Sequence, residues 1–166
     1  MIDLYRIVKE KRAAQAMDGQ GAKTYGGRWN HPGTSMVYTS GSLSLAAHET
    51  FVHLGYDSIH LSYVFIQIQI SDTYKDPSGK KDLPFVKTIE ESGLPAGWKL
   101  EPPPNSTKKI GTDWALGKET AVLKVPSILI PGEFNYLLNP DHDLFRVIKV
   151  LPPKPFKFDE RMIKSP

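Results

Sequence analysis

The chain has 166 residues, 40% of them hydrophobic, and contains no cysteine. This length predicts one globular domain, and the lack of cysteine excludes disulfides, thiolate metal sites and a cysteine nucleophile. Its 21 basic and 18 acidic residues leave a formal net charge of +3, which is too small for the basic surface of a typical nucleic-acid-binding protein. No apolar run approaches the ~18 residues that cross a bilayer and the N-terminus lacks a secretory signal, so we expect a cytoplasmic protein with no membrane partner.

Two strands, a glycine-rich loop and a helix are predicted in the first third of the chain. Residues 4–8 form the first strand, and residues 19–33, which contain five glycines and no apolar period, predict a long loop. A second strand at residues 36–39 leads to Ser42, a favourable N-cap for a helix that we expect to end at Gly55. Apolar residues cover two sides of this helix, which predicts that it packs between layers.

The clearest strand covers residues 61–70, because apolar and other side chains alternate along it with a period of two. After it the composition changes to proline, glycine, lysine and serine. We expect a short helix around residues 83–92, and the three prolines at 102–104 exclude a helix or a central strand there. We interpret residues 72–107 as a variable connector rather than a second domain.

The last third of the chain predicts one more helix, at residues 105–116, followed by several short strands. These strands cover residues 121–125, 127–130, 135–138 and 145–150. We expect the tail at residues 152–166 to be irregular. Because strands outnumber helices and no repeated strand–helix–strand unit is visible, the sequence predicts a single α+β domain, residues 1–166, in which helices flank mixed or antiparallel sheets.

A candidate anion-binding residue follows two glycines near the end of the glycine-rich loop. Arg28 has a planar guanidinium group that suits phosphate or carboxylate, and Gly26 and Gly27 allow the backbone to approach a ligand closely. The alternative is a loop arginine paired with an acidic side chain, and the spacing of the residues does not separate the two. Trp29, the next residue, is expected to anchor the loop or the core.

Three further residues are candidates for the same site. Tyr38 lies in the second strand, where the alternative is a core aromatic whose hydroxyl reaches an edge. Glu49 lies on the largely apolar helix, where an ionised carboxylate needs a hydrogen-bonding partner or a cleft. Ser127 lacks the Gly-x-Ser-x-Gly turn of serine hydrolases, so we expect it to form hydrogen bonds in a cleft rather than act as a nucleophile.

Metal-binding and nucleotide-binding motifs are missing from the sequence. His48 and His53 lie five residues apart and not at the i, i+4 spacing of zinc ligands on a helix, and the other histidines are scattered, so we expect no metal site. Neither a Gly-x-Gly-x-x-Gly motif nor a P-loop is present, which gives no support to Rossmann-type dinucleotide binding or to ATP hydrolysis.

Five sequence blocks, taken in order, resemble the RES domain family, which is named for Arg, Glu and Ser. The blocks are GGRWN at 26–30, VYTS at 37–40, AHE at 47–49, VPS at 125–127 and PGEFNYLLNP at 131–140. The resemblance extends from Leu4 to Phe145 and covers nearly the whole chain, although the connector matches poorly. Several blocks in the right order are far more specific than any single motif.

The resemblance implies a bacterial type II toxin that inhibits growth and is encoded with an Xre-like helix-turn-helix antitoxin, in a fold similar to ADP-ribosyltransferase toxins. Members of the family deplete NAD by cleaving its nicotinamide–ribose bond, through hydrolysis or phosphorolysis, and some relatives attach ADP-ribose to a protein. NAD is then the substrate and no cofactor is required, while DNA is contacted only through the antitoxin. By this match the active-site positions are Arg28, Tyr38, Glu49 and Ser127, and the recurrent positions near the pocket are Arg6 and Asn135.

These side chains suit the chemistry of NAD. Arg28, together with Arg6, would hold the pyrophosphate, and Tyr38 would stack on the nicotinamide or the ribose. Glu49 would stabilise the positive charge that develops on the ribose or activate the attacking group, and Ser127 would bind the nicotinamide amide or a ribose oxygen. Nicotinamide leaves readily because its ring nitrogen is cationic, so no general acid is needed.

The acceptor, the class of function and the oligomeric state stay open at this point. Water and phosphate both suit the same carbocationic centre, and a protein side chain is the acceptor if the chain is an ADP-ribosyltransferase. A non-catalytic binding module, acting on nucleic acid through its mild positive charge, is the alternative from a different class. Self-association is compatible with the sequence, but no interface can be located from it.

Overall fold

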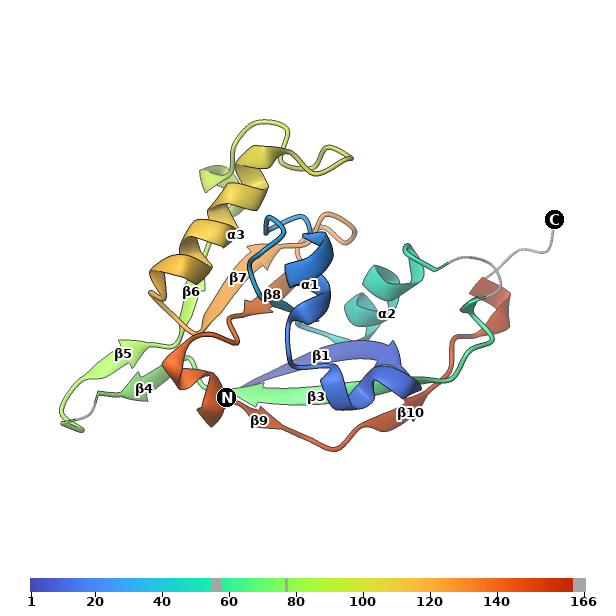
Figure 1. Cartoon of the computed structure of the whole chain (residues 1–166), viewed down its shortest axis with the longest axis horizontal. Helices are drawn as coiled ribbons and strands as arrows, with labels where there is room; N and C mark the ends of the chain where they lie inside the picture. Colours follow the sequence, from blue (N-terminus) through green and yellow to red (C-terminus); the bar gives the residue numbers. More distant parts are fainter. Residues whose placement is uncertain (55–57, 77, 163–166) are drawn as a thin grey trace.

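A curled mixed sheet forms the body of the structure, a computed structural model that describes residues 1–54, 58–76 and 78–162 (Figure 1). The strand order is β10-β3-β1-β2-β8-β7-β6, and β9 also pairs with β3. These strands are β1 (Ile2–Lys9), β2 (Val37–Ser40), β3 (Tyr63–Ile70), β6 (Val86–Thr88), β7 (Val122–Pro126), β8 (Phe134–Leu138), β9 (Lys149–Val150) and β10 (Lys154–Phe156). A separate hairpin contains β4 (Thr73–Lys75) and β5 (Asp82–Pro84).

Three α-helices accompany the sheet in the described part of the chain. They are α1 (Gln20–Tyr25), α2 (Leu43–Phe51) and α3 (Asn105–Gly117). Short 3-10 helices occupy Glu10–Gln15, Glu91–Gly93, Asp143–Val147 and Glu160–Met162. Within the described residues, no helix combines the length and the apolar composition that a membrane span requires. The mixed sheet with flanking helices confirms the predicted α+β fold class.

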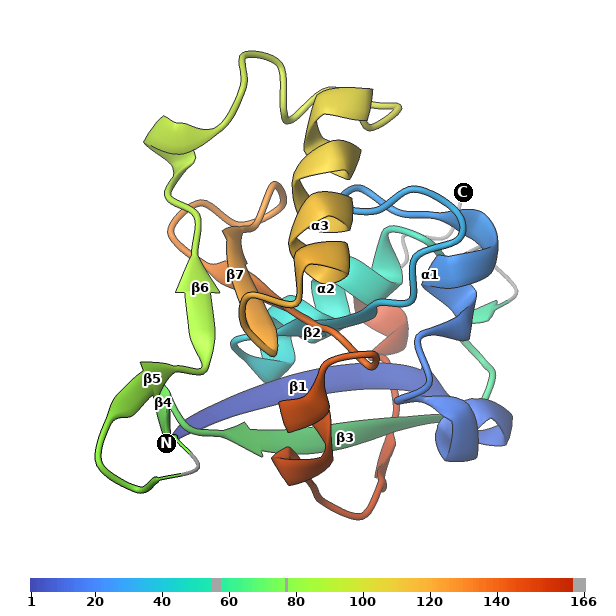
Figure 2. The ribbon, with the colours of Figure 1, turned by 60° about the vertical axis from the view of Figure 1, so that its left-hand side comes forward.

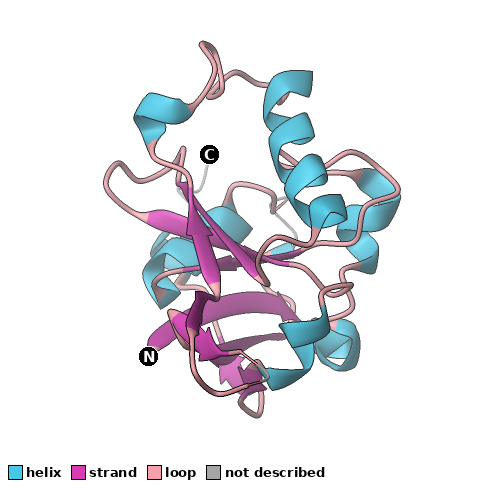
Figure 3. Ribbon diagram, turned by 90° about the vertical axis from the view of Figure 1, so that its left-hand side faces the viewer, coloured by secondary structure: helices cyan, strands magenta, loops and turns pink. Residues whose placement is uncertain are grey.

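The sheet is nearly divided between β1 and β2. β1 pairs with β3 along its whole length, whereas it pairs with β2 through one position, Tyr5 opposite Ser40. On the far side, β2, β8 and β7 are antiparallel neighbours, and β6 adds to β7 in the parallel direction. Figure 3 shows the two groups of strands. Beyond this single pair the two strands form no further ladder pairs. The backbone carbonyl of Tyr38 in β2 instead accepts a hydrogen bond from the side chain of Arg6 in β1.

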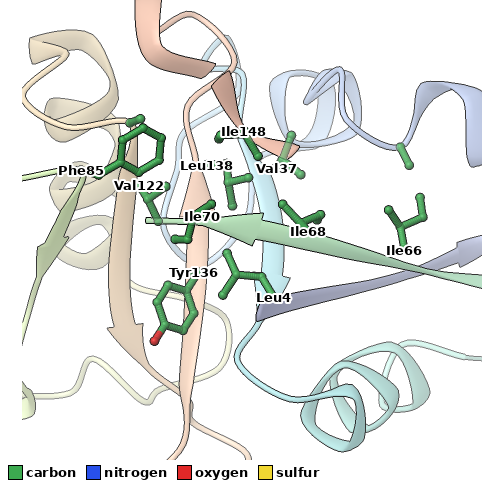
Figure 4. Close-up of a cluster of buried hydrophobic side chains, with 12 residues drawn as sticks. Leu4, Val37, Ile66, Ile68, Ile70, Phe85, Val122, Tyr136, Leu138 and Ile148 are labelled. Atoms are coloured by element: carbon green, nitrogen blue, oxygen red, sulfur yellow. The ribbon is translucent and has the colours of Figure 1, made fainter. Parts of the chain in front are cut away.

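The main hydrophobic core lies between the two halves of the sheet (Figure 4). Its fully buried members include Leu4 of β1, Ile68 of β3, Val37 of β2, Val122 of β7 and Leu138 of β8. Because one cluster takes side chains from both halves, the sheet has to curl on itself. Burial of each of these aliphatic side chains stabilises the fold by about 1.5–3 kcal/mol.

One helix covers the face of each half that points away from the main core: α3 on the half with β7 and β8, and α2 on the half with β1 (Figure 2). Trp114 of α3 packs in one cluster with Leu123 of β7 and Leu137 of β8. The adjacent residues on these strands, Val122 and Leu138, belong to the main core on the opposite face. Ala46 of α2 packs in another cluster with Ile7 of β1. α2 therefore lies against β1, and this contact places the helix that carries Glu49 beside the division of the sheet.

The glycine-rich loop and the connector contain more regular structure than predicted. α1 lies within the loop expected at residues 19–33. The helix expected around residues 83–92 is wrong, because these residues form β5, β6 and a 3-10 turn. β6 exists because Val86 pairs with Val122, a contact between distant parts of the chain that overrides local preference.

The strand predicted at residues 127–130 is also wrong. These residues form a turn in which the Ser127 hydroxyl oxygen accepts hydrogen bonds from the backbone N–H groups of Leu129 and Ile130, at 3.1 and 3.2 Å. A serine side chain that bonds to the backbone two or three residues later competes with strand pairing. The turn places Ser127 at the end of β7 instead of within a strand.

The C-terminal region contains less strand than expected in one segment and more strand than expected in the next. The strand predicted at residues 145–150 is reduced to β9, because the first half of the segment belongs to a 3-10 helix. The tail after Pro152, expected to be irregular, contributes β10 to the edge of β3. The helix end predicted at Gly55 lies outside the described residues.

Candidate functional site

Glu49, Ser127 and Asn135 come together in the structure. The Asn135 amide donates a 2.5 Å hydrogen bond to Oε1 of Glu49, and the Ser127 hydroxyl donates a longer one, 3.3 Å, to the same oxygen. The three side chains come from α2, the turn after β7 and β8, so elements far apart in the sequence converge on one carboxylate. Both donors bind Oε1, and no hydrogen bond from the described residues reaches Oε2.

The local structure explains why Glu49 occupies this position. The Ser42 hydroxyl accepts a hydrogen bond from the Leu45 N–H and caps the start of α2. The same hydroxyl donates to the Glu133 carboxylate at 2.7 Å, and the Glu133 carbonyl accepts from the Ser127 N–H at 2.9 Å. Glu133 therefore links the first turn of the helix that carries Glu49 to the turn that carries Ser127.

Arg28 lies apart from this group and is already paired. Its guanidinium donates to the carbonyls of Trp98 and Leu100, at 2.8 and 3.0 Å, and to the Glu101 carboxylate at 2.8 Å. The Arg28 side chain is 11% exposed, whereas that of Glu101 is 75% exposed, so the acidic partner lies on the solvent side. The structure therefore contains the ion pair that the sequence offered as the alternative to a ligand site.

Tyr38 holds the loop that carries Arg28. Its hydroxyl donates to Oδ1 of Asn30 at 2.7 Å and accepts from the Trp29 N–H at 3.1 Å. Burial raises the pKa of Tyr38, so the phenol stays protonated at neutral pH and keeps donating to Asn30. Asn30 is itself fully buried, and its amide nitrogen donates to three backbone carbonyls of the same loop.

Arg6 is a partly buried cation near the division of the sheet. One of its terminal nitrogens donates to the Tyr38 carbonyl at 2.7 Å, while its Nε is buried without a hydrogen-bonding partner. Burial lowers the pKa of Arg6, and the Asp18 charge partly opposes this effect, yet a guanidinium stays protonated at any physiological pH. No carboxylate of the described residues forms an ion pair with Arg6, which leaves it able to bind an anion.

β2 connects the two groups of candidate residues. Tyr38 lies opposite Leu137 and Ser40 lies opposite Asn135, so the side chains of Tyr38 and Ser40 point to the same face of the strand, about 7 Å apart. The Ser40 hydroxyl donates to Oδ1 of Asn135 at 2.8 Å. One end of this strand therefore contacts the Arg28 loop and Arg6, and the other end contacts the Glu49 cluster.

Two hollows in the described surface lie away from the candidate site. One of about 490 Å³ is lined by α3 residues such as Ile110 and by Leu94 and Pro95 of the connector, and one of about 550 Å³ adjoins Phe158. Glu49 lines neither hollow, so the candidate site is described by the contacts between its side chains and not by a cavity. Within the described residues, no group of three or more histidine or acidic side chains is arranged to hold a metal.

Sequence reasoning missed three residues that act on the candidate site, namely Ser40, Asn30 and Glu101. Ser40 and Asn30 lie in the VYTS and GGRWN blocks. A small polar side chain next to a buried position was the sequence feature that could have identified each of them. Glu101 lies in the poorly matched connector and contacts Arg28 only through the fold. Its pairing left no local trace in the sequence.

A family model for the RES domain matches residues 3–159 of this chain. A protein named "Toxin Res" from Yersinia enterocolitica is 38% identical over 160 residues, which are 96% of this chain and 98% of that protein. A protein named "Prs ADP-ribosylating toxin" from a Sphingobium species is 35% identical over 163 residues, 97% of this chain and 96% of that protein.

The fold is also found in a solved structure. A chain in the crystal structure of the M. tuberculosis MbcT-MbcA toxin-antitoxin complex superposes with a TM-score of 0.66 at 15% identity, covering 94% of this chain and 84% of that one. At this identity the similarity concerns the fold alone. It agrees with the predicted fold class, a single α+β domain.

Proposed function

Because this chain belongs to the RES domain family, we propose that it is the toxin of a bacterial toxin–antitoxin pair and that it consumes NAD by cleaving the nicotinamide–ribose bond. Full-length relatives named "Toxin Res" at 34–38% identity support the first part. The second part rests on the chemistry of the Glu49 cluster and of Arg6.

The observation that carries the proposal is the carboxylate of Glu49, fixed through Oε1 by Asn135 and Ser127. Cleavage of NAD places positive charge on the ribose as the bond to nicotinamide lengthens. A carboxylate that is held still by neutral donors stabilises such a charge without having to reorganise. Glu49 supplies this negative charge through Oε2.

The reaction balances without a cofactor. An oxygen of water or phosphate forms a bond to the ribose C1′, and the bond between C1′ and the nicotinamide nitrogen breaks. The electron pair of that bond neutralises the pyridinium, so nicotinamide leaves as a neutral molecule and needs no proton. The proton of an attacking water passes to Glu49 or to solvent.

Arg6 is the more favourable partner for the pyrophosphate of NAD. Its guanidinium is partly buried, has an Nε without a hydrogen-bonding partner and forms no ion pair among the described residues, so an anionic ligand would supply an acceptor and a counter-charge. Arg28 has to exchange the Glu101 carboxylate for the ligand before it can contribute. Tyr38 supports both arginines, through its carbonyl and its hydroxyl, and stacking of its ring on the substrate stays a prediction.

The proposed partner is an antitoxin that blocks the site. The structural neighbour from M. tuberculosis was solved as a toxin–antitoxin complex, which supports a partner of this kind. That the antitoxin is an Xre-like helix-turn-helix protein, that DNA is contacted only through it, and that the pair acts in the cytoplasm all stay predictions.

The test is to incubate the purified protein with NAD, with and without phosphate, and to measure free nicotinamide. We expect release by the wild type and loss of at least about tenfold in Glu49→Gln and Arg6→Ala. Dependence on phosphate would identify phosphorolysis. No release by the wild type, or equal release by Glu49→Gln, contradicts the proposal.

A second candidate function is ADP-ribosylation of a protein, which the name of the Sphingobium relative favours. In this case a nucleophilic side chain of the target takes the place of water at C1′. Mass spectrometry of a bacterial lysate treated with the toxin and NAD should then show ADP-ribose on a discrete protein. A lysate without adducts, in which nicotinamide is nevertheless released, favours simple NAD cleavage.

A further inference from the structure

We infer that Ser40 is a positioning residue for the Glu49 carboxylate and that it acts through the amide of Asn135. The inference rests on the proposed NAD-cleaving function. Ser40 is 4% exposed, and its hydroxyl is 2.8 Å from Oδ1 of Asn135, whose Nδ2 is 2.5 Å from Oε1 of Glu49. The three groups form one chain of hydrogen bonds from β2 through β8 to α2.

The chemistry of the groups fixes the direction of this chain. An ionised carboxylate only accepts hydrogen bonds, so the NH₂ end of the Asn135 amide has to face Glu49. The carbonyl end then faces Ser40, and only a donor can satisfy it. The Ser40 hydroxyl is that donor. Without it, the Asn135 carbonyl oxygen loses its donor, and only the contact with Glu49 still fixes which end of the amide faces the carboxylate.

The backbone around Ser40 is well suited to this task. Ser40 lies opposite Asn135 in the β2–β8 ladder and opposite Tyr5 at the one position where β1 and β2 pair. It is also two residues before Ser42, the N-cap of the helix that carries Glu49. The serine is therefore held on both sides by neighbouring strands and is connected by a short stretch of chain to α2.

Thr39 provides a matched control on the same strand. Its hydroxyl is equally buried, at 3% exposure, and donates to the Tyr136 carbonyl at 2.7 Å. Ser40→Ala and Thr39→Val each remove one hydroxyl from a buried residue; the first leaves a side chain smaller by one atom, and the second keeps the shape of threonine. Only the hydroxyl of Ser40 is linked to Glu49, so a purely structural role predicts similar losses in the two variants.

The experiment measures kcat and KM for nicotinamide release by the wild type, Ser40→Ala, Thr39→Val, Asn135→Ala and the Ser40→Ala/Asn135→Ala double variant. We expect Ser40→Ala to lower kcat by about tenfold or more with KM changed less than about twofold, and Thr39→Val to retain kcat within about twofold. If Ser40 acts through Asn135, the double variant should be no slower than Asn135→Ala alone.

Thermal unfolding of every variant separates loss of fold from loss of activity. Equal losses of kcat in Ser40→Ala and Thr39→Val, or losses from Ser40 and Asn135 that multiply in the double variant, overturn the inference. A wild type that releases no nicotinamide overturns the proposed function and the inference with it. An active wild type with a fully active Ser40→Ala variant overturns the inference alone.

Discussion

The two arginines of the candidate site differ in how their charge is compensated. Arg28 is neutralised by an exposed carboxylate and donates to two backbone carbonyls. Arg6 is partly buried, donates to one carbonyl and has a buried Nε without a partner. A buried charge that lacks an ion pair lowers stability unless a ligand provides the opposite charge. This difference between the two arginines leads to separate predictions for stability and for substrate binding.

Replacing Arg6 by methionine should raise stability and impair NAD binding together. The apolar side chain removes a partly buried charge that has no ion pair among the described residues, and each kcal/mol gained raises the unfolding temperature by about 2–4 °C in a chain of this size. Arg28→Met, which loses an ion pair and two hydrogen bonds, should instead lower the unfolding temperature. Calorimetry of both variants and their KM values for NAD test this. A lower unfolding temperature for Arg6→Met would contradict the assignment of Arg6 as a destabilising cation without an ion pair.

Glu101 should compete with the substrate for Arg28. In Glu101→Gln the guanidinium loses its counter-charge but keeps its two backbone carbonyls, so an anionic substrate replaces a weaker partner. Exposed ion pairs contribute about 0.2–1 kcal/mol, so KM for NAD should fall by up to about fivefold with kcat unchanged, and the difference should shrink at high salt. Glu91→Gln, which removes the exposed ion pair with Lys99 in the same connector, is the control and should leave KM unchanged.

Helix α3 and the Arg28 loop touch through a residue that has no side chain. A Cβ atom on Gly111 would lie 2.0 Å from the carbonyl oxygen of Trp29, a backbone atom of the loop. Such a contact cannot be relieved by rotation of a side chain. The glycine therefore sets how closely α3 approaches the loop whose other side is held by Tyr38.

Gly111→Ala should consequently destabilise the protein and weaken NAD binding at the same time. Overpacking of this kind costs about 1–3 kcal/mol, which corresponds to a fall of roughly 2–12 °C in the unfolding temperature. Gly117→Ala is the control, because a Cβ there meets no atom within 4 Å and alanine is the better helix former. It should raise the unfolding temperature slightly. Similar behaviour of the two variants would show that the loop yields to α3.

The elements that the sequence predicts well are those whose signals are local. Residues 61–70 contain β3, because alternation of side chains directly reports a half-buried strand. α3 was likewise predicted to within about one residue, since Pro104 precedes its start. β6 was missed because it depends on pairing with β7, and a three-residue strand has no period of its own.

The candidate site follows the same rule. Glu49 and Ser127 were candidates from their sequence context and Asn135 through the family resemblance, but their convergence on Oε1 depends on three distant elements that no local pattern connects. The pairing of Arg28 with Glu101 was an open alternative, because residues so far apart in the chain meet only in the folded molecule. Partners of buried polar groups are therefore the part of a site that a single sequence predicts least well.

At the level of the whole molecule, the C-terminal segment closes the half of the sheet that carries Arg6. β10 pairs with the edge of β3, and Phe158 behind it is 2% exposed. Its ring makes edge-to-face contacts with Tyr63 and Phe156, with centroids 5.2 and 5.0 Å apart. Phe158 also shares a cluster with Ala46 of α2, so the tail supports the helix that positions the catalytic carboxylate proposed here.

Phe158→Ala should therefore destabilise the whole domain and not only fray its end. Truncation of a buried phenylalanine costs about 3–5 kcal/mol, which predicts a fall of roughly 6–20 °C in the unfolding temperature. Val150→Ala on β9, 43% exposed and on the same sheet edge, should change it by only a few degrees. If the tail were an independent appendage, Phe158→Ala would leave the cooperative transition of the core intact and affect only hydrogen exchange near the C-terminus. Because the phenylalanine packs against both β3 and α2, we expect one cooperative transition, lowered as a unit, with kcat at low temperature retained.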